Sequence, residues 1–229
     1  MAVYRAKKAG LDKDKIYSLC LLCLLGGMAG AKLLFIITEF QNIYKDLSIL
    51  LDVSNGFVVF GGIIGGALTG YIYCRVKKID FLEYFDLAVP SVALAQGFGR
   101  IGCFLAGCCY GRETDSFIGI TFNESLYAPN GVSLLPTQLF SSAGDFLLAL
   151  ILILYSRKKR EKGKIVLLYL IMYSVGRFII EFFRNDPRGS VGTLSTSQFV
   201  SVCTLVIVVV FYILMRYRIK RLRTNMERQ

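Results

Sequence analysis

The sequence contains no histidine, and its 16 acidic residues are outnumbered by 27 lysines and arginines. Without histidine, the side chain that most often acts as a general base is excluded, so any proton transfer must use another group. A separate soluble domain is also missing, because apolar runs occupy most of the 229 residues and 55% of the residues are hydrophobic. This composition excludes a soluble globular protein and predicts a single membrane domain over residues 1–229.

Six apolar runs approach the length of about 20 residues that a helix needs to cross the hydrocarbon core. They cover approximately residues 16–38, 56–74, 86–109, 137–156, 165–183 and 197–215. The first run follows a basic tail, as in a signal peptide, but it continues to Ile37, which favours an uncleaved helix. We therefore expect an all-α, polytopic membrane protein with about six transmembrane helices.

The basic residues are concentrated in four blocks that flank the apolar runs. These blocks are the N-terminal tail, the turn after the second run, the turn around residues 156–164 and the C-terminal tail, and they hold twenty of the 27 basic residues. In a six-span protein all four fall on one side, so the positive-inside rule predicts that both termini are cytoplasmic. The basic C-terminus could suggest nucleic acid, but its position beside a span favours attraction to anionic lipid, and no nucleic-acid partner is expected.

The loop between the third and fourth runs contains short strand-like pieces. Residues 118–122 and 132–135 are rich in β-branched and aliphatic residues and are separated by Ala-Pro and Asn-Gly turns. Within residues 112–136 we therefore expect a small extracytoplasmic cap over the site.

Several charged residues lie inside the predicted spans at a similar depth. Arg100 is about fifteen residues beyond the cytoplasmic end of the third run, or roughly 20 Å into the membrane. In the fifth run, Tyr173, Arg177 and Glu181 follow one another at intervals of four residues and share one helical face. The charged residues at this depth are Lys32, Arg100, Arg177, Glu181 and Arg184.

This set has four cations and one carboxylate, which do not neutralise one another. The imbalance predicts a bound anion, and in the outer leaflet the phosphate of a phospholipid is the obvious one, because arginine binds phosphate through a planar fork. The alternative is a group of snorkelling interface residues with one Arg177–Glu181 pair. That alternative fits Arg100 poorly, since glycine, apolar residues and cysteine flank it on both sides.

Glycine is concentrated in the first three runs. Gly61 and Gly62 belong to a small-residue pattern on the second run that is typical of closely packed membrane helices. Gly99 and Gly102 belong to a denser group around Arg100. These glycines could let the helix break and expose backbone N–H groups to an anion.

The seven cysteines fall into two classes. Four lie within apolar runs and are expected to be small core residues: Cys20, Cys23, Cys74 and Cys203. The other three, Cys103, Cys108 and Cys109, lie close to Arg100 and Arg112, where positive charge should lower a thiol pKa. Three hypotheses stay open for them: packing, a disulfide or metal staple of the helix end, and a nucleophile that transiently carries an acyl or glyceryl group. No cofactor is predicted.

Several motifs occur in an order and spacing that resemble the prolipoprotein diacylglyceryl transferase family. They are GGMAGAKLLFIITEF at 26–40, FGGIIGGALTG at 60–70, QGFGRIGCFLAGCC at 96–109, PTQLF at 136–140 and YSVGRFIIEFFR at 173–184. The resemblance extends over nearly the whole chain and implies a bacterial cell-membrane enzyme with its site open to the outer leaflet. It implies phosphatidylglycerol as donor and the cysteine thiol of a lipoprotein precursor as acceptor, with release of glycerol phosphate. A thiol or hydroxyl group of another molecule stays open as the acceptor of this chain.

The resemblance also assigns roles to residues. Arg100 and Arg177 would hold the phosphate and stabilise the charge that develops on it as it departs. The candidate catalytic residues are Arg100, Arg177, Glu181, Cys108 and Cys109. The candidate substrate-binding residues are Lys32, Gly61, Gly62, Gly99, Gly102, Gln138, Tyr173 and Arg184.

The chain departs from the family pattern at several positions. Phe60 and Leu135 stand where the family has histidines, Cys103 replaces an asparagine, Cys108 replaces an acid, and Ser141 stands at another acidic position. The chain also starts at what resembles the family's second helix.

These departures leave the base undetermined, and Glu181, Tyr110 or a lowered pKa of the acceptor thiol are the options. Two further functions stay open: a phospholipid-binding or transport protein without turnover, and a thiol-redox membrane protein that uses the Cys-Cys-Tyr-Gly cysteines.

Overall fold

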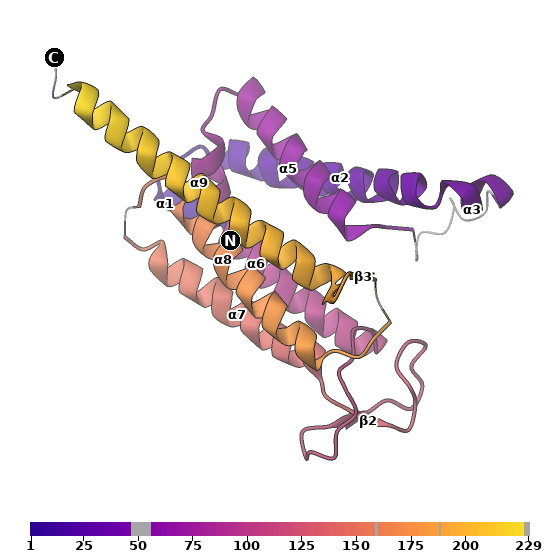
Figure 1. Ribbon diagram of the computed structural model, residues 1–229. Coiled ribbons are helices and arrows are strands. Elements are labelled where there is room, and N and C mark those ends of the chain that lie inside the picture. The colour runs from indigo at the N-terminus through magenta and orange to yellow at the C-terminus, as the bar shows by residue number, and fades with distance from the viewer. Residues whose placement is uncertain (47–55, 159, 188, 227–229) are drawn as a thin grey trace. The chain divides into compact units, whose positions relative to one another are not determined.

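The computed structural model describes residues 1–46, 56–158, 160–187 and 189–226, and it is mainly helical (Figure 1). Within these residues, six helices are long and apolar enough to cross a membrane. They are α2 (Lys13–Thr38), α5 (Val59–Val76), α6 (Phe81–Ala106), α7 (Thr137–Tyr155), α8 (Lys164–Ile180, followed by the 3₁₀ turn η1 at Glu181–Phe183) and α9 (Thr196–Met226). The expected all-α polytopic architecture with six apolar helices is confirmed.

The helix ends differ from the sequence expectation in two informative places. α2 begins before the apolar run because the Asp12 side chain accepts hydrogen bonds from the backbone N–H groups of Asp14 (2.9 Å) and Lys15 (3.3 Å), which is an N-cap. α6 ends at Ala106 rather than at residue 109, because Gly107 adopts a left-handed φ of 72°.

The remaining elements are short. Two small helices, α1 (Ala2–Lys8) and α3 (Phe40–Lys45), flank α2. β1 (Ile120–Thr121) pairs antiparallel with β2 (Ser133–Leu134), which confirms the strand-like pieces expected between the third and fourth runs. β3 (Ser190–Val191) and β4 (Leu194–Ser195) form a second antiparallel pair just before α9.

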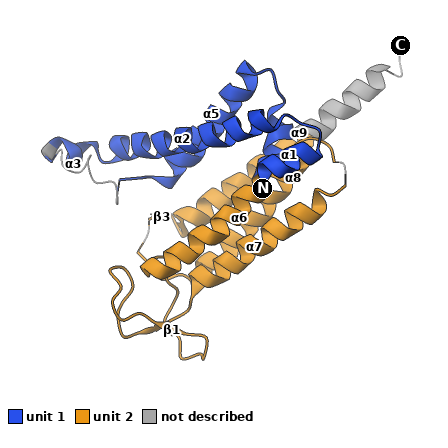
Figure 2. Ribbon diagram, turned by 180° about the vertical axis from the view of Figure 1, so that it is seen from behind, with its two compact units in different colours: residues 1–88 blue, residues 89–229 orange. Residues whose placement is uncertain are grey.

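The chain divides into two compact units, residues 1–88 and 89–229 (Figure 2). The first unit contains α2 and α5, which pack along their glycines, and a core that includes Ile16, Leu19 and Cys74. A Cβ placed on Gly61 would collide with the carbonyl oxygen of Gly30, so the two backbones are in direct contact. The prediction that the whole chain is a single membrane domain stays a prediction.

The second unit contains the C-terminal part of α6 together with α7, α8 and α9. Its core is formed mainly by aliphatic residues of α6 and α7, namely Val89, Ala93, Leu148, Ala149 and Leu152, with Ile165 from α8. Many large side chains elsewhere in the chain are exposed, among them Leu24 (61%), Leu105 (80%) and Val206 (56%). Such extensive apolar exposure is expected of helices whose outer faces contact lipid.

Candidate active site

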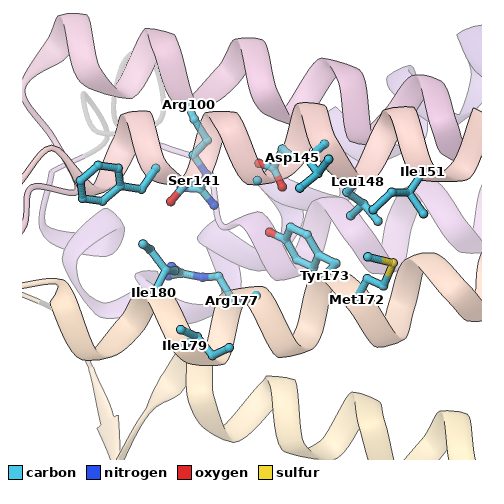
Figure 3. Close-up of a pocket in the computed structure, with 14 residues that line it drawn as sticks. Arg100, Ser141, Asp145, Leu148, Ile151, Met172, Tyr173, Arg177, Ile179 and Ile180 are labelled. Atoms are coloured by element: carbon cyan, nitrogen blue, oxygen red, sulfur yellow. The ribbon is translucent and has the colours of Figure 1, made fainter.

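Helices α6, α7 and α8 of the second unit line a cavity of about 250 Å³ (Figure 3). Its polar lining consists of Arg100, Ser141, Asp145, Tyr173 and Arg177. Its apolar lining consists of Phe140, Leu147, Leu148, Ile151, Met172, Ile179 and Ile180. Three residues predicted from the sequence, Arg100, Tyr173 and Arg177, therefore meet in one place.

Contacts along α6 explain why Arg100 faces this cavity. Gly97 lies directly against α7: its carbonyl oxygen accepts a hydrogen bond from Ser142 Oγ (2.9 Å), and a Cβ at this position would lie 2.6 Å from the Phe146 ring. One residue earlier, the Gln96 side chain accepts a hydrogen bond from the Tyr169 hydroxyl of α8 (2.8 Å). These contacts set the rotation of α6, and Arg100 follows less than one turn later.

Arg100 is opposed by a hydroxyl and not by an ion-pair partner. Its guanidinium interacts with Tyr173, whose ring stacks on Tyr169 with centroids 5.6 Å apart. Among the residues that the structure describes, no carboxylate lies within 4.0 Å of Arg100, although Asp145 is in electrostatic range. The fork of Arg100 thus retains donors for a further acceptor in the cavity.

Arg177 and Glu181 form a buried ion pair at one end of the cavity. Arg177 Nη2 lies 2.9 Å from Glu181 Oε2 and donates a hydrogen bond to Ser197 Oγ (2.8 Å). The other oxygen of Glu181, Oε1, accepts a hydrogen bond from Ser195 Oγ (2.7 Å). The Glu181 side chain is only 1% exposed, so its carboxylate is committed to these partners and is poorly placed to act as a base.

The same buried network includes Arg184. Its guanidinium binds Asp186 through two hydrogen bonds of 2.8 Å and 2.6 Å and lies 3.7 Å from Glu181. Burial alone would lower the pKa of Arg184, but the hydrogen bonds to Asp186 and the nearby carboxylates raise it. Arg184 does not line the cavity, and its charge is matched within the protein.

Gln138 is likewise absent from the cavity lining. Its side chain is 1% exposed, and Nε2 donates a hydrogen bond of 2.8 Å to the carbonyl oxygen of Cys108. The neighbouring Thr137 donates through Oγ1 to the carbonyl oxygen of Cys109 (2.8 Å). Gln138 therefore holds the turn that follows α6.

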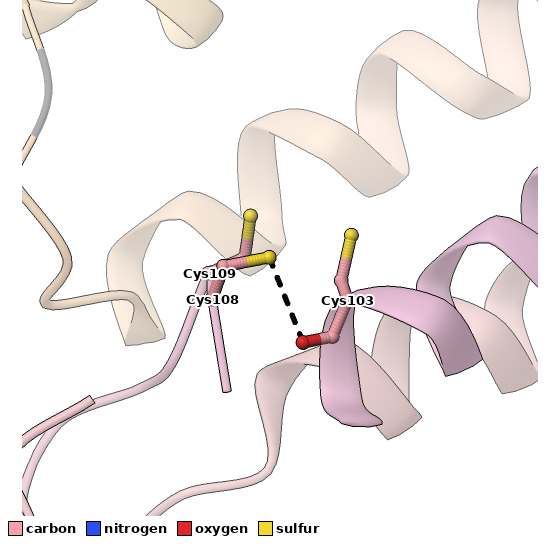
Figure 4. A group of neighbouring side chains, drawn as sticks. All are labelled: Cys103, Cys108 and Cys109. Atoms are coloured by element: carbon pink, nitrogen blue, oxygen red, sulfur yellow. Dashed lines mark hydrogen bonds between the residues drawn. The ribbon is translucent and has the colours of Figure 1, made fainter. Parts of the chain in front are cut away.

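The two cysteines of that turn form a cluster with Cys103 of α6 (Figure 4). The sulfur atoms of Cys103, Cys108 and Cys109 lie within 4.8 Å of one another, and Cys108 Sγ donates a 3.6 Å hydrogen bond to the carbonyl oxygen of Cys103. Burial and the neighbouring Cys109 raise the pKa of Cys108, while the Cys103 thiol and burial raise the pKa of Cys109. The expectation that arginines lower these two pKa values is wrong. At Cys109 the positive charge of Arg184 lowers the pKa, but the Cys103 thiol and burial raise it by more.

The model of the prolipoprotein diacylglyceryl transferase family matches residues 1–214. The chain belongs to this family. Two relatives share about half of its residues. A Clostridium tetani protein called phosphatidylglycerol–prolipoprotein diacylglyceryl transferase is 52% identical over 93% of this chain and 86% of its own length. A Clostridium perfringens protein of that name, numbered 2, is 54% identical over 88% of this chain and 79% of its own length.

A second Clostridium perfringens transferase, numbered 1, is 35% identical over 95% of this chain and 85% of its own length. This chain is thus much more similar to one of that organism's two numbered transferases than to the other. Membership of this transferase family, together with the six apolar helices, indicates a multi-pass bacterial membrane protein.

Some residues assigned by the family resemblance lie in the first unit. Lys32 Nζ lies 5.2 Å and 5.4 Å from the ring centroids of Phe35 and Phe57, which are cation–π distances. Gly61 and Gly62 both face α2. A Cβ on Gly61 would collide with Gly30, and a Cβ on Gly62 would lie 3.4 Å from the carbonyl oxygen of Gly27. Their observed role is helix packing.

The prediction that glycines break the helix around Arg100 is wrong for Gly99 and Gly102. α6 continues without interruption through Gly99 and Gly102, and a Cβ at either position would meet no atom within 4 Å. In apolar surroundings every backbone N–H must be bonded within the helix, which outweighs the helix cost of about 1 kcal/mol per glycine. The helix ends after Ala106, where Gly107 adopts a φ of 72°.

Asp145 is the functional candidate that the sequence reasoning missed. It is 7% exposed, lies in the middle of α7 and lines the cavity opposite Tyr173 (Figure 3). A single acid inside an otherwise apolar span was the available signal, because such residues usually mark functional sites. With Asp145 and Asp186 included beside Glu181, three carboxylates lie near Arg100, Arg177 and Arg184, so the predicted excess of positive charge is smaller than the sequence implied.

Proposed function

We propose that this chain transfers the diacylglyceryl group of phosphatidylglycerol to the cysteine thiol of a lipoprotein precursor. The observation that carries the proposal is the cavity, in which two arginines and a tyrosine face a wall of aliphatic side chains. A phospholipid has the same division into an anionic and an apolar part. The names of the relatives in Clostridium support the same donor and acceptor.

The size of the cavity indicates which part of the lipid it holds. Sites for small molecules usually have volumes of about 300–1,000 Å³, so a cavity of about 250 Å³ accommodates a head group but not two acyl chains. In this proposal Arg100 binds the phosphate, with Tyr173 and Arg177 beside it. The acyl chains follow the aliphatic residues of α7 and α8 towards the lipid.

The transfer requires one bond to form and one to break. The acceptor sulfur attacks the carbon of the diacylglyceryl group that carries the phosphate, the bond between that carbon and the phosphate oxygen breaks, and glycerol phosphate departs with the bonding electrons. Arg100 and Arg177 stabilise the negative charge that collects on the phosphate. The thiol proton must pass to a base, and Asp145 is the carboxylate that lines the cavity, whereas Glu181 is engaged by Arg177, Arg184 and Ser195.

We further propose that the whole chain acts as one membrane domain, with both termini cytoplasmic and the cavity in the outer leaflet. The four basic blocks support this orientation. A C-terminal fusion to a reporter that is active only in the cytoplasm should be active, and an inactive but intact fusion would contradict the orientation.

The reaction can be tested with purified protein in phosphatidylglycerol vesicles and a lipobox peptide. We expect release of glycerol phosphate and a peptide mass increased by one diacylglyceryl group. Bound lipid without glycerol phosphate would instead support a lipid-binding protein, the alternative raised by the absence of histidine. A thiol-based reaction would be supported if changing Cys108 and Cys109 to serine abolished transfer while variants of Arg100 and Asp145 kept it.

A further inference from the structure

We propose that Cys103, Cys108 and Cys109 form a binding site for one thiophilic metal ion of the Zn²⁺ class. This site is separate from the cavity, whose lining contains none of the three residues. The proposal does not depend on the transferase function.

The sulfur positions are close to those that a metal requires. In a zinc–thiolate site the metal–sulfur distance is about 2.3 Å, so ligand sulfurs around one ion lie about 3.8 Å apart. The three sulfurs of this cluster already lie within 4.8 Å of one another. A movement of about 1 Å or less, within reach of side-chain rotation, would bring them to bonding positions.

The backbone of the turn is constrained so that these sulfurs converge. Gly107 has a φ of 72° and Cys109 a φ of 60°, and the second value is unusual for a residue with a side chain. This bend carries Cys108 and Cys109 back over the end of α6, where Cys103 lies (Figure 4). Strain of this kind persists only where the surrounding structure enforces it, and it concentrates at functional sites.

Buried side chains of α7 hold the turn in place. Thr137 and Gln138, each 1% exposed, donate to the carbonyl oxygens of Cys109 and Cys108, and the Cys108 N–H donates to the Cys103 carbonyl oxygen (3.1 Å). Partners of this kind orient the ligands of metal sites and influence metal affinity. A bound ion would therefore fasten the end of α6 to the turn that Thr137 and Gln138 bind to the beginning of α7.

The charge and chemistry of the surroundings suit such an ion. Thiolates select soft metals, and three thiolates with one divalent ion leave a single negative charge. Arg100 acts electrostatically on Cys103 and Cys109, and Arg184 acts on Cys109, so positive charge is near to balance it. Within the described residues the cluster contributes three ligands, which leaves a fourth position for water.

The test is a titration of the reduced, purified full-length protein in detergent with Zn²⁺ in the presence of a chromophoric chelator. We expect one ion per chain, with an affinity tighter than micromolar, and a sulfur-to-metal charge-transfer band when Co²⁺ replaces Zn²⁺. Replacing any one of the three cysteines with serine should weaken binding more than about 100-fold, because changes at supporting residues alone cost 10- to 100-fold. The control is Cys203→Ser, which alters a cysteine of α9 outside the cluster and should bind as the parent does.

A second measurement on the unaltered protein guards against variants that fail to fold. Zn²⁺ should protect Cys103, Cys108 and Cys109 from maleimide, as mapped by peptide mass spectrometry, while the extent of labelling at Cys20, outside the cluster, should not change. Equal labelling with and without Zn²⁺, an affinity weaker than micromolar, or equal losses in the Cys203→Ser control would overturn the proposal.

Discussion

Removing the buried carboxylate of Glu181 should lower the free energy of unfolding by several kcal/mol, and this change is the sharpest test of the ion network. Glu181→Gln preserves the size of the side chain and an oxygen for Ser195, but it leaves Arg177 without its counter-charge. Arg184 keeps Asp186, so the loss falls on Arg177, whose side chain is 14% exposed. Breaking a buried pair by removing one partner typically costs about 3–5 kcal/mol.

The chain offers a matched control in Glu161→Gln. Glu161 pairs with Lys164 at 3.0 Å, but the two side chains are 62% and 35% exposed, so the pair should contribute about 1 kcal/mol or less. At about 2–4 °C per kcal/mol for a chain of this size, we expect a fall in Tm of about 6–20 °C for Glu181→Gln and at most about 4 °C for the control.

The assay is thermal unfolding in detergent, followed with a dye that reports the exposure of buried cysteines. The double variant Arg177→Met with Glu181→Met should recover much of the lost stability, since an apolar pair can replace a buried ion pair. Equal Tm values for Glu181→Gln and Glu161→Gln would refute the assignment of a buried, committed carboxylate.

Three further predictions concern the cavity, the helix contact and the cysteines. Asp145→Asn should reduce turnover about 10²- to 10⁴-fold while lipid binding persists, as expected for loss of a general base. The control Asp115→Asn, in the exposed loop, should leave turnover unchanged. Equal turnover of the two variants would show that Asp145 has no role in the reaction. Gly61→Ala should destabilise by about 1–3 kcal/mol in thermal unfolding because it crowds α2, whereas Gly99→Ala, with open space around it, should be neutral or stabilising. Because its pKa is raised, Cys109 in metal-free protein should react with iodoacetamide more slowly than free cysteine at pH 8 and approach it only at more alkaline pH, as followed by peptide mass spectrometry.

The membrane helices and part of the site were predictable because they depend on local pattern. Apolar runs of sufficient length identify α2 and α5 to α9, and strand-like pieces identify the β1–β2 pair. The four-residue spacing of Tyr173 and Arg177 and the depth of Arg100 predicted that these residues lie close together, and all three line the cavity. Each of these inferences needs only the length and period of a single helix.

The rest of the site depends on contacts between distant segments. Asp145 reaches the cavity because the Ser142–Gly97 contact sets the rotation of α7 against α6, which no single helix reveals. The carboxylate of Glu181 is held by a hydrogen bond from Ser195 of β4, which lies 14 residues further along the chain. The pKa of Cys109 depends on a neighbouring thiol as well as on nearby charge, and that neighbour is placed by the turn at Gly107.

The central claim is that Arg100 holds the phosphate of the lipid donor during transfer. The most direct measurement is the rate of glycerol phosphate release from phosphatidylglycerol vesicles that contain a lipobox peptide. It compares Arg100→Ala with Arg157→Ala, since Arg157 is exposed and follows the end of α7. With equal amounts of folded protein, we predict a loss of about 10²- to 10³-fold or more for Arg100→Ala, as for removal of other charge-stabilising donors, and parent-like rates for Arg157→Ala. Full turnover in Arg100→Ala would contradict the account.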